Sequence, residues 1–261
     1  MNIIDILLFN PLFNGLIGTY HILPGQDMGV AIIVLTIVVR GILAYPSAKS
    51  IKAQRELQLI QPKLEALKEQ YKDNKEQMGQ KLMEFYKEHK VNPFSSCLPT
   101  LIQLPIIFVL YRVFINGLAL DPETGTLVAH QIDRLYGSLH TIYATTPIHT
   151  TAFGFLDLTA PHNILLALVT GALQFWQSRM LVARQAPIKS KGARDENMAA
   201  SMSKQMMYIF PLITAYFAYL FPAGLALYWL TSTLFQVVQQ YILFRRVHPS
   251  KELDDLTASQ T

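Results

Sequence analysis

Residues 28–46, MGVAIIVLTIVVRGILAYP, form an apolar stretch that carries one charge, Arg40. A helix needs roughly 20 mostly apolar residues to cross a hydrocarbon core of about 30 Å. Four further apolar stretches follow, at 98–118, 164–177, 206–221 and 224–244. Pro222-Ala223-Gly224 separates the last two, because a proline cannot continue a helix and a glycine relieves the turn. Since backbone groups in lipid must be satisfied internally, the pattern predicts an all-α integral membrane protein with five transmembrane helices.

The composition favours a membrane protein over a soluble one. Of the 261 residues, 51% are hydrophobic and only 15% are charged, and the mean hydropathy is +0.25. A soluble domain usually carries about 25% charged residues, so this chain lacks the charge to cover a soluble surface of its size. The single cysteine, Cys97, excludes a disulfide scaffold and a cysteine-ligated metal site.

The basic residues predict the orientation of the helices. Of the 22 Lys and Arg residues, 19 lie in 49–90, in 179–204 and in the tail beyond 244. Five spans place these three segments on one side of the membrane, which the positive-inside rule makes cytoplasmic. The N-terminus is then outside and the C-terminus is cytoplasmic. The net charge of +4 follows from this topology, and no nucleic-acid partner is needed to explain it.

The remaining segments divide the chain into three parts. Residues 1–27 lack the positive n-region and the cleavage site of a signal peptide. We expect them to form a short amphipathic helix on the outer interface, with a loose tail as the alternative. Residues 28–246 form the five-helix core, with an outer loop at 119–163 and a second cytoplasmic loop at 179–205. Residues 247–261 form a short cytoplasmic tail.

The segment 51–90 is the longest polar stretch within the core. Its charges alternate in sign, and its apolar residues recur at helical spacing, with a turn signal at Asp73-Asn74. This pattern predicts two antiparallel helices that form a cytoplasmic hairpin. The hairpin is either a spacer between the first two spans or a docking site for partners.

Arg40 is the most informative residue of the spans. A charged side chain near the bilayer centre costs about 2.5–3.5 kcal/mol on insertion scales. Its side chain either extends to the cytoplasmic headgroups or faces a water-filled cavity. We favour the cavity, because Thr36 and Ser47 share its helical face and Lys49 already anchors the cytoplasmic end. Polar residues of other spans are available to complete a groove: Gln103, Thr170, Gln174, Gln177, Thr214, Ser232 and Gln236.

The five spans contain no Asp, Glu or His. Ion-coupled transporters and intramembrane proteases generally depend on such residues. We therefore expect a protein that is not an enzyme and that binds no metal or other cofactor. A cation without a countercharge would instead attract an acidic or polar substrate segment, because Coulomb attraction is stronger in a low dielectric than in water.

Five stretches resemble the YidC/Oxa/Alb family of membrane protein insertases. They are AIIVLTIVVR (31–40), LIQPKLEALKEQYKDN (59–74), KLMEFYKEHKVNPFSSCLPTLIQLPIIFVLYRV (81–113), FGFLDLTAP (153–161) and FPAGLALYWLTSTLFQVVQQYIL (221–243). The resemblance implies a positively charged groove that contains Arg40, open to the cytoplasm and to lipid and closed to the outside. It implies further groove residues: Thr36, Leu104, Pro105, a glutamine of the third span (Gln174 or Gln177) and Trp229.

Together these observations predict a membrane protein insertase or chaperone in a bacterial-type plasma membrane. Its partners would be nascent membrane proteins and the lipid bilayer, with the ribosome and a Sec-type translocon as further candidates. The substrate groove would be lined by the residues that the resemblance implies together with Ser47, Gln103 and Ser232. The alternatives are a small-solute channel or transporter, and an assembly scaffold without insertion activity.

Overall fold

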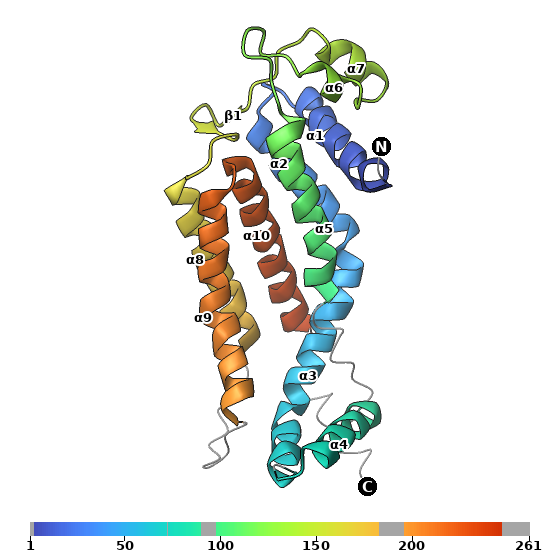
Figure 1. The fold of residues 1–261 in the computed structure, drawn as a ribbon, viewed down its shortest axis with the longest axis vertical. Helices are drawn as coiled ribbons and strands as arrows, with labels where there is room; N and C mark the ends of the chain where they lie inside the picture. Colours follow the sequence, from blue (N-terminus) through green and yellow to red (C-terminus); the bar gives the residue numbers. More distant parts are fainter. Residues whose placement is uncertain (1–2, 72, 90–97, 183–195, 247–261) are drawn as a thin grey trace.

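The computed structural model describes residues 3–71, 73–89, 98–182 and 196–246. Cys97, the tail 247–261 and much of the loop expected at 179–205 lie outside these residues. Helices dominate the described part of the chain, with one short two-stranded hairpin (Figure 1). The structure is therefore mostly helical, as the apolar stretches predict.

The elements follow one another along the chain in a simple order. They are η1 (Asp5–Phe9), α1 (Asn10–Ile22), α2 (Met28–Ile42), α3 (Ala44–Gln70), α4 (Lys75–Glu88), α5 (Leu98–Arg112), η3 (Val113–Gly117), α6 (Ala129–Ile132), α7 (Gly137–Tyr143), β1 (Thr151–Ala152), β2 (Leu156–Asp157), α8 (Ile164–Val182), α9 (Glu196–Leu220) and α10 (Ala223–Arg246). The elements η1 and η3 are single π-helical turns that extend α1 and α5.

Each of the five apolar stretches is helical over most or all of its length, and α9 and α10 are separated at Phe221-Pro222, where the break was expected. Helices α8 and α9 pack along their length, and α10 lies between this pair and α2 (Figure 1). Small residues allow this close packing, because Ala167, Ala218 and Ala226 form a buried cluster and Gly171 faces Ala215.

Among the described residues, no single helix is both long enough and apolar enough to cross a membrane. Helix α2 and the first part of α3 meet the two criteria when taken together, and a bend of 62° separates them.

The bend between α2 and α3 lies inside the stretch expected to form one straight span. Helical bonding resumes after it, since Leu43 N donates to Val39 O at 3.1 Å and Ser47 N donates to Leu43 O at 3.0 Å. Pro46 falls in the first turn of α3, where a missing N–H costs nothing. Helix α3 then continues without interruption to Gln70, so it includes both the end of the apolar stretch and the first arm of the hairpin.

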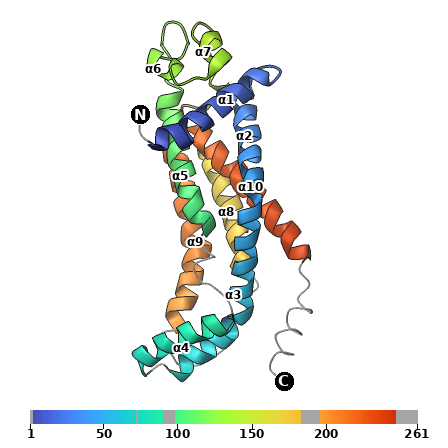
Figure 2. The same ribbon diagram turned by 90° about the vertical axis from the view of Figure 1, so that its right-hand side faces the viewer.

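Helix α4 folds back beside the end of α3 (Figure 2). The turn lies at the expected place, because Asn74 caps α4 by accepting a bond from Gln77 N at 3.1 Å. The hairpin occupies one end of the molecule, and α1, α6 and α7 occupy the other (Figures 1 and 2).

The N-terminal segment is helical and packs into the core, so the loose-tail alternative is wrong. Helix α1 crosses the ends of α2 and α5 (Figure 2), and Phe13, Ile17 and Tyr20 are fully buried. Gly117 lies against α1, because a Cβ there would be in contact with the ring of Phe13 at 3.4 Å. The main hydrophobic core therefore includes α1 together with α2, η3, the outer loop and the start of α10.

Candidate functional site

The Arg40 side chain reaches from the last turn of α2 into the space between α5 and α10. Only 8% of the residue is exposed. Its Nε donates to Ser232 Oγ at 2.6 Å, and its Nη2 donates to the same oxygen. Nη2 also donates to Gln103 Oε1 at 2.5 Å. Three helices therefore meet at one guanidinium group.

Gln236, one helical turn beyond Ser232, adds a further partner. Its amide oxygen faces Arg40 and lies 2.7 Å from both Nη1 and Nη2, in the orientation that pairs donors with acceptors. The other end of this amide, now its NH₂ group, lies 2.5 Å from the end of the Gln177 amide, which accepts the bond when that amide is turned in the same way. Gln174 Nε2 is in turn 3.0 Å from Gln177 Oε1. A row of amides therefore connects Arg40 to α8. We call Arg40, Gln103, Ser232 and Gln236 the Arg40 cluster.

The Arg40 cluster contains no acidic residue. Within the described residues, no carboxylate lies within the 4.0 Å of an ion pair with Arg40. The oxygens that accept its bonds belong to one hydroxyl and two amides. Neutral acceptors satisfy the hydrogen-bonding capacity of a guanidinium without cancelling its charge. The cluster therefore contains a buried positive charge whose hydrogen-bond partners are polar but uncharged.

A narrow apolar recess, with room for about one water molecule, lies beside the cluster, so the described residues do not form the water-filled cavity that was expected there. Helices α1, α2, α5 and α10 contribute its walls, with Phe114 of η3: Leu12, Leu16, Ile32, Leu35, Thr36, Val39, Ile106, Leu110, Phe114 and Tyr228. Tyr228 connects the recess to the cluster, because its hydroxyl accepts a bond from Gln103 Nε2 at 2.7 Å. Thr36 does not offer its hydroxyl proton to the recess, since it donates to Ile32 O at 2.6 Å.

Most of the residues expected in the groove lie near Arg40. Gln103 and Ser232 bond it directly, Gln174 and Gln177 follow through Gln236, and Thr36 lies one turn away in the recess wall. Ser47 bonds a different partner, because its hydroxyl donates to Gln239 Oε1 at 3.0 Å.

Three of the expected residues are not drawn into the cluster. Leu104 is 58% exposed and Pro105 is also exposed, on a different face of α5 from the recess residues Ile106 and Leu110. Trp229 is half-buried, next to Tyr228 in sequence but without a bond to the cluster. The described geometry therefore centres the polar site on Arg40, α10 and the glutamines.

Sequence reasoning missed Tyr228 and Gln239, and it placed Gln236 only among the available polar residues. A signal for them was present, because positions 228, 232, 236 and 239 follow one another at three- or four-residue intervals. Such spacing lines up one face of a helix, here the face of α10 that meets α2 and α5.

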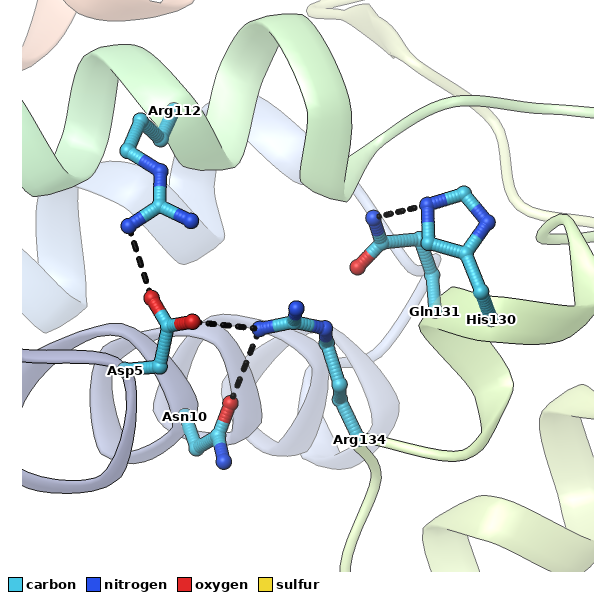
Figure 3. A network of polar contacts seen from close by, with 6 residues as sticks. All are labelled: Asp5, Asn10, Arg112, His130, Gln131 and Arg134. Carbon is cyan, nitrogen blue, oxygen red and sulfur yellow. Dashed lines mark hydrogen bonds and ion pairs between the residues drawn. The ribbon is translucent and has the colours of Figure 1, made fainter. Parts of the chain in front are cut away.

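A second arginine site lies at the opposite end of α5, around Asp5 (Figure 3). Arg112 Nη1 donates to Asp5 Oδ1 at 2.7 Å. Arg134 Nη1 lies 3.8 Å from Asp5 Oδ2 and 3.5 Å from Asn10 Oδ1. Both guanidinium groups lie over the ring of Phe9, at 5.1 and 4.9 Å from its centroid. We call these five residues the Asp5 cluster.

The Asp5 cluster joins three segments that are distant in sequence. Asp5 comes from η1, Arg112 from α5 and Arg134 from the outer loop (Figure 3). Asn14 strengthens the connection, because its Nδ2 donates to Arg134 O at 2.8 Å and its Oδ1 accepts from Tyr136 N at 2.6 Å. The N-terminal helix is thereby bound to the outer loop and to α5.

Comparison with known proteins gives a consistent result. Residues 19–251 match the family model of the 60 kDa inner membrane protein. A membrane protein insertase YidC from Fusobacterium nucleatum is 32% identical over 221 residues, which cover 84% of this chain and 87% of that protein. The proteins of the same name from Streptomyces avermitilis and Mannheimia succiniciproducens are 31% and 35% identical. This chain spans only 52% and 34% of their lengths.

A solved structure supports the same assignment. The crystal structure of an active YidC insertase, with its first transmembrane domain resolved, superimposes with a TM-score of 0.54 at 28% sequence identity. The match covers 90% of this chain and 46% of the solved one. The helical arrangement described above therefore resembles that of a known insertase over most of the present chain.

Proposed function

The chain belongs to the 60 kDa inner membrane protein family, whose matched relatives are membrane protein insertases of bacteria, and we propose that it brings newly made proteins into the lipid bilayer by means of the Arg40 cluster. Its setting is the bacterial plasma membrane, and its substrates are nascent membrane proteins. We expect no catalysis and no cofactor, because transfer of the client's apolar helix into lipid is itself favourable by about 0.8 kcal/mol per buried CH₂ group.

The single observation that carries this proposal is the buried positive charge without a countercharge. The hydroxyl and amide oxygens around Arg40 are weaker acceptors for a guanidinium than a carboxylate is. An acidic side chain of a client can therefore replace one of them at a net gain. Because the surroundings are shielded from water, this attraction is stronger than it would be at a solvated surface.

The recess supports the same mechanism from the apolar side. Its walls are aliphatic and aromatic, and its polar boundary lies at Tyr228 and Gln103, next to Arg40. A client segment with an acidic or polar end and an apolar remainder would enter by separating these walls, with its polar end at the cluster. The exposed apolar faces of α8 and α9 then provide a surface along which the client meets lipid.

The topology that we propose has five membrane-spanning helices, a cytoplasmic hairpin and an outer N-terminal helix. The distribution of Lys and Arg supports it, since the hairpin α3–α4 carries much of the positive charge. The position of α1, α6 and α7 at the end opposite the hairpin is consistent with this orientation (Figure 2). We expect the charged hairpin to receive the client, alone or from a ribosome or a Sec-type translocon.

The test is insertion into liposomes by the purified chain, with two clients that share one apolar helix. One client has an acidic tail and the other a neutral tail of the same length. Arg40→Ala should slow insertion of the acidic client by about tenfold, the effect of losing one bond to a charged group, and should change the neutral client little.

Arg179→Ala is the matched control, because Arg179 is an exposed arginine in the last turn of α8. It should leave both rates unchanged. Equal slowing of the two clients by Arg40→Ala would show that Arg40 serves the fold and does not attract the substrate.

A further inference from the structure

The hairpin β1–β2 ends in a turn of unusual composition. Ala152 pairs with Leu156, so residues 153–155 form the connection. Phe155 N donates to Ala152 O at 3.1 Å, which closes a turn with Phe153 and Gly154 at its centre. Their φ angles are +53° and +78°, so both residues are left-handed, as in a type I′ turn.

Phenylalanine is a poor choice at this position. Left-handed central residues of hairpin turns are usually Asn, Asp or Gly, since a bulky side chain meets steric resistance there. The rings are only partly used by the core, because Phe153 is 44% exposed, with its ring edge against Gly29 of α2, and Phe155 is 79% exposed. Asn at 153 would suit the left-handed backbone better. Strained conformations that persist in a native structure are frequent at functional sites.

The hairpin is held firmly against two helices of the Arg40 cluster. Phe153 N donates to Asp27 Oδ2 at 2.5 Å, and the other oxygen of Asp27 caps α2 by accepting from Val30 N at 2.9 Å. Gly224 N donates to Leu158 O at 2.8 Å, and Ala223 N donates to Ala160 O at 2.9 Å. The hairpin segment is thus bonded to the first turn of α2, which carries Arg40, and of α10, which carries Ser232.

We propose that the aromatic tip, Phe153 and Phe155, inserts into the outer headgroup region of the bilayer and thereby sets the depth of α2 and α10. This inference rests on the proposed function for the position of the membrane. The hairpin lies beyond the first turn of α8 (Figure 1), whose Ile164, Leu165 and Leu168 are 63%, 70% and 64% exposed. The tip therefore continues an apolar surface that meets lipid, at the level where aromatic residues gather in membrane proteins.

The nearest carboxylate on the hairpin does not oppose this insertion. Asp157 Oδ1 accepts bonds from Thr159 N at 2.9 Å and from Thr159 Oγ1 at 2.7 Å, so its charge is partly satisfied by the chain itself. The aromatic rings lie 6.3 Å apart, centroid to centroid, and present a joint apolar surface. A lipid interface fits such a surface because it accepts apolar side chains without a shaped partner.

The first experiment compares stability with insertion in the variant Phe153→Asn. Asn is a preferred residue for the left-handed turn, so the melting temperature should stay the same or rise. The rate of client insertion should nevertheless fall severalfold, because the depth of Arg40 is no longer fixed. Tyr136→Asn is the matched control, since Tyr136 is an aromatic residue of the outer loop that is 52% exposed and lies outside the hairpin. It should leave insertion unchanged.

Two outcomes of this comparison would overturn the proposal. An unchanged insertion rate would show that the tip has no function in insertion. A lower melting temperature together with slower insertion would show that Phe153 serves the fold.

The second experiment measures contact with lipid directly and does not depend on insertion activity. The variant Phe155→Trp is placed in vesicles whose lipids carry bromine either near the headgroup or deep in the acyl chains. The added emission, relative to the parent chain with Trp176 and Trp229, should be blue-shifted and quenched most by the shallow bromines. An emission maximum typical of water, without quenching by either lipid, would overturn the proposal. If Phe153→Asn nevertheless slowed insertion, the tip would contact a protein partner and not lipid. If quenching is seen but Arg40→Ala has no client-dependent effect, the proposed function fails and the interfacial tip stands.

Discussion

Two arginine sites in the described part of the chain are built in opposite ways. In the Asp5 cluster one carboxylate serves two arginines, and Arg112 bonds it at 2.7 Å. In the Arg40 cluster the acceptors among the described residues are a hydroxyl and two amides. The sites also differ in burial, since Arg40 is 8% exposed while the side chains of Arg112 and Arg134 are 29% and 23% exposed, but the main contrast is in the partner. The difference is the countercharge, and it separates an arginine that binds its own chain from one that is available to a substrate.

The physical basis of this difference is the strength of the partner that a newcomer has to displace. A carboxylate bonded to a guanidinium is a strong, charge-assisted partner, and the two guanidinium groups over the ring of Phe9 add cation–π attraction. Such a cluster stays closed. Neutral oxygens bind the same cation less strongly, so a client's carboxylate can compete with them. The comparison therefore predicts that removing the carboxylate from the Asp5 cluster weakens its hold on the fold. It also predicts that adding a carboxylate to the Arg40 cluster makes Arg40 unavailable to a client.

Removal of the acid from the Asp5 cluster should have the largest effect. In Asp5→Asn two guanidinium groups, whose side chains are only 29% and 23% exposed, are left without their countercharge. Breaking a buried ion pair from one side costs about 3 kcal/mol or more, so we expect a loss of this size in the free energy of unfolding. Thermal and denaturant unfolding in detergent measure it.

Asp133→Asn is the control for this loss. It removes the same charge from the neighbourhood of Arg134, but Asp133 is 78% exposed and lies near His140, at 3.9 Å. It should change stability by less than about 0.5 kcal/mol, the usual range for surface substitutions. A similar loss in both variants would mean that the overall charge of the outer loop matters and that the cluster does not.

Addition of an acid to the Arg40 cluster is the converse change. Gln236→Glu keeps the shape of the side chain and places a carboxylate where an amide oxygen lies 2.7 Å from both terminal nitrogens of Arg40. The cation then has an internal partner, so insertion of the acidic client should slow by about tenfold while the neutral client is little affected. Liposome insertion rates of the two clients give the answer.

Gln70→Glu is the control, because it makes the same chemical change at an exposed residue of the hairpin, away from the Arg40 cluster. It should leave the insertion rates of both clients unchanged. If Gln236→Glu inserts the acidic client at the parent rate, the attraction of the client to Arg40 is refuted. If it slows both clients equally, the substitution has damaged the fold, which a lower melting temperature would reveal.

Replacement of arginine by lysine keeps the charge and removes the planar group, and the two sites should respond differently. Arg112→Lys loses much of the contact with Phe9 and should lower stability by about 1 kcal/mol without changing insertion. Arg40→Lys should retain the preference for the acidic client at a rate reduced by about threefold, since charge attracts the client and the bonding pattern only orients it. Complete loss of that preference would assign selectivity to the geometry of the guanidinium.

Much of the fold could be predicted, because each helix of the bundle is an apolar stretch bounded by polar residues or by Pro and Gly. The bend at Leu43 was not predicted, because the hydropathy of the stretch 28–46 favours one span, although Gly41 and Pro46, residue types that are common at helix kinks, flank the bend. The burial of α1 was also not predicted. Apolar residues lie on both faces of the N-terminal segment, and exposed Ile6 and Leu7 give no sign that Phe9 and Phe13 are buried.

The site was predicted where a polar residue interrupts an apolar helix, as with Arg40, Gln103 and Ser232. The countercharge of Arg112 could not be found this way, because Asp5 lies 107 residues away in the chain and outside the apolar spans. No local pattern connects two such positions. Pairing between distant charges is decided by tertiary packing, so the contrast between the two arginine sites was visible only in three dimensions.

The smallest effect concerns a carboxylate that is held without any arginine. Asp121 is exposed and accepts bonds from Glu123 N at 2.9 Å and Thr124 N at 3.0 Å. The Thr124 backbone bond, followed by that of Glu123, lowers the pKa of this carboxyl below its ordinary value. A lowered pKa in the folded state means that the stabilisation is present above the ordinary aspartate pKa of about 3.9 and is lost as the pH falls through the folded value. Asp121→Asn should therefore speed hydrogen exchange of these two amides near neutral pH, and the difference from the parent should vanish in strong acid. A global loss of stability, as expected for Asp5→Asn, would instead show that an acid bound mainly by backbone amides can support the fold as an ion-paired acid does.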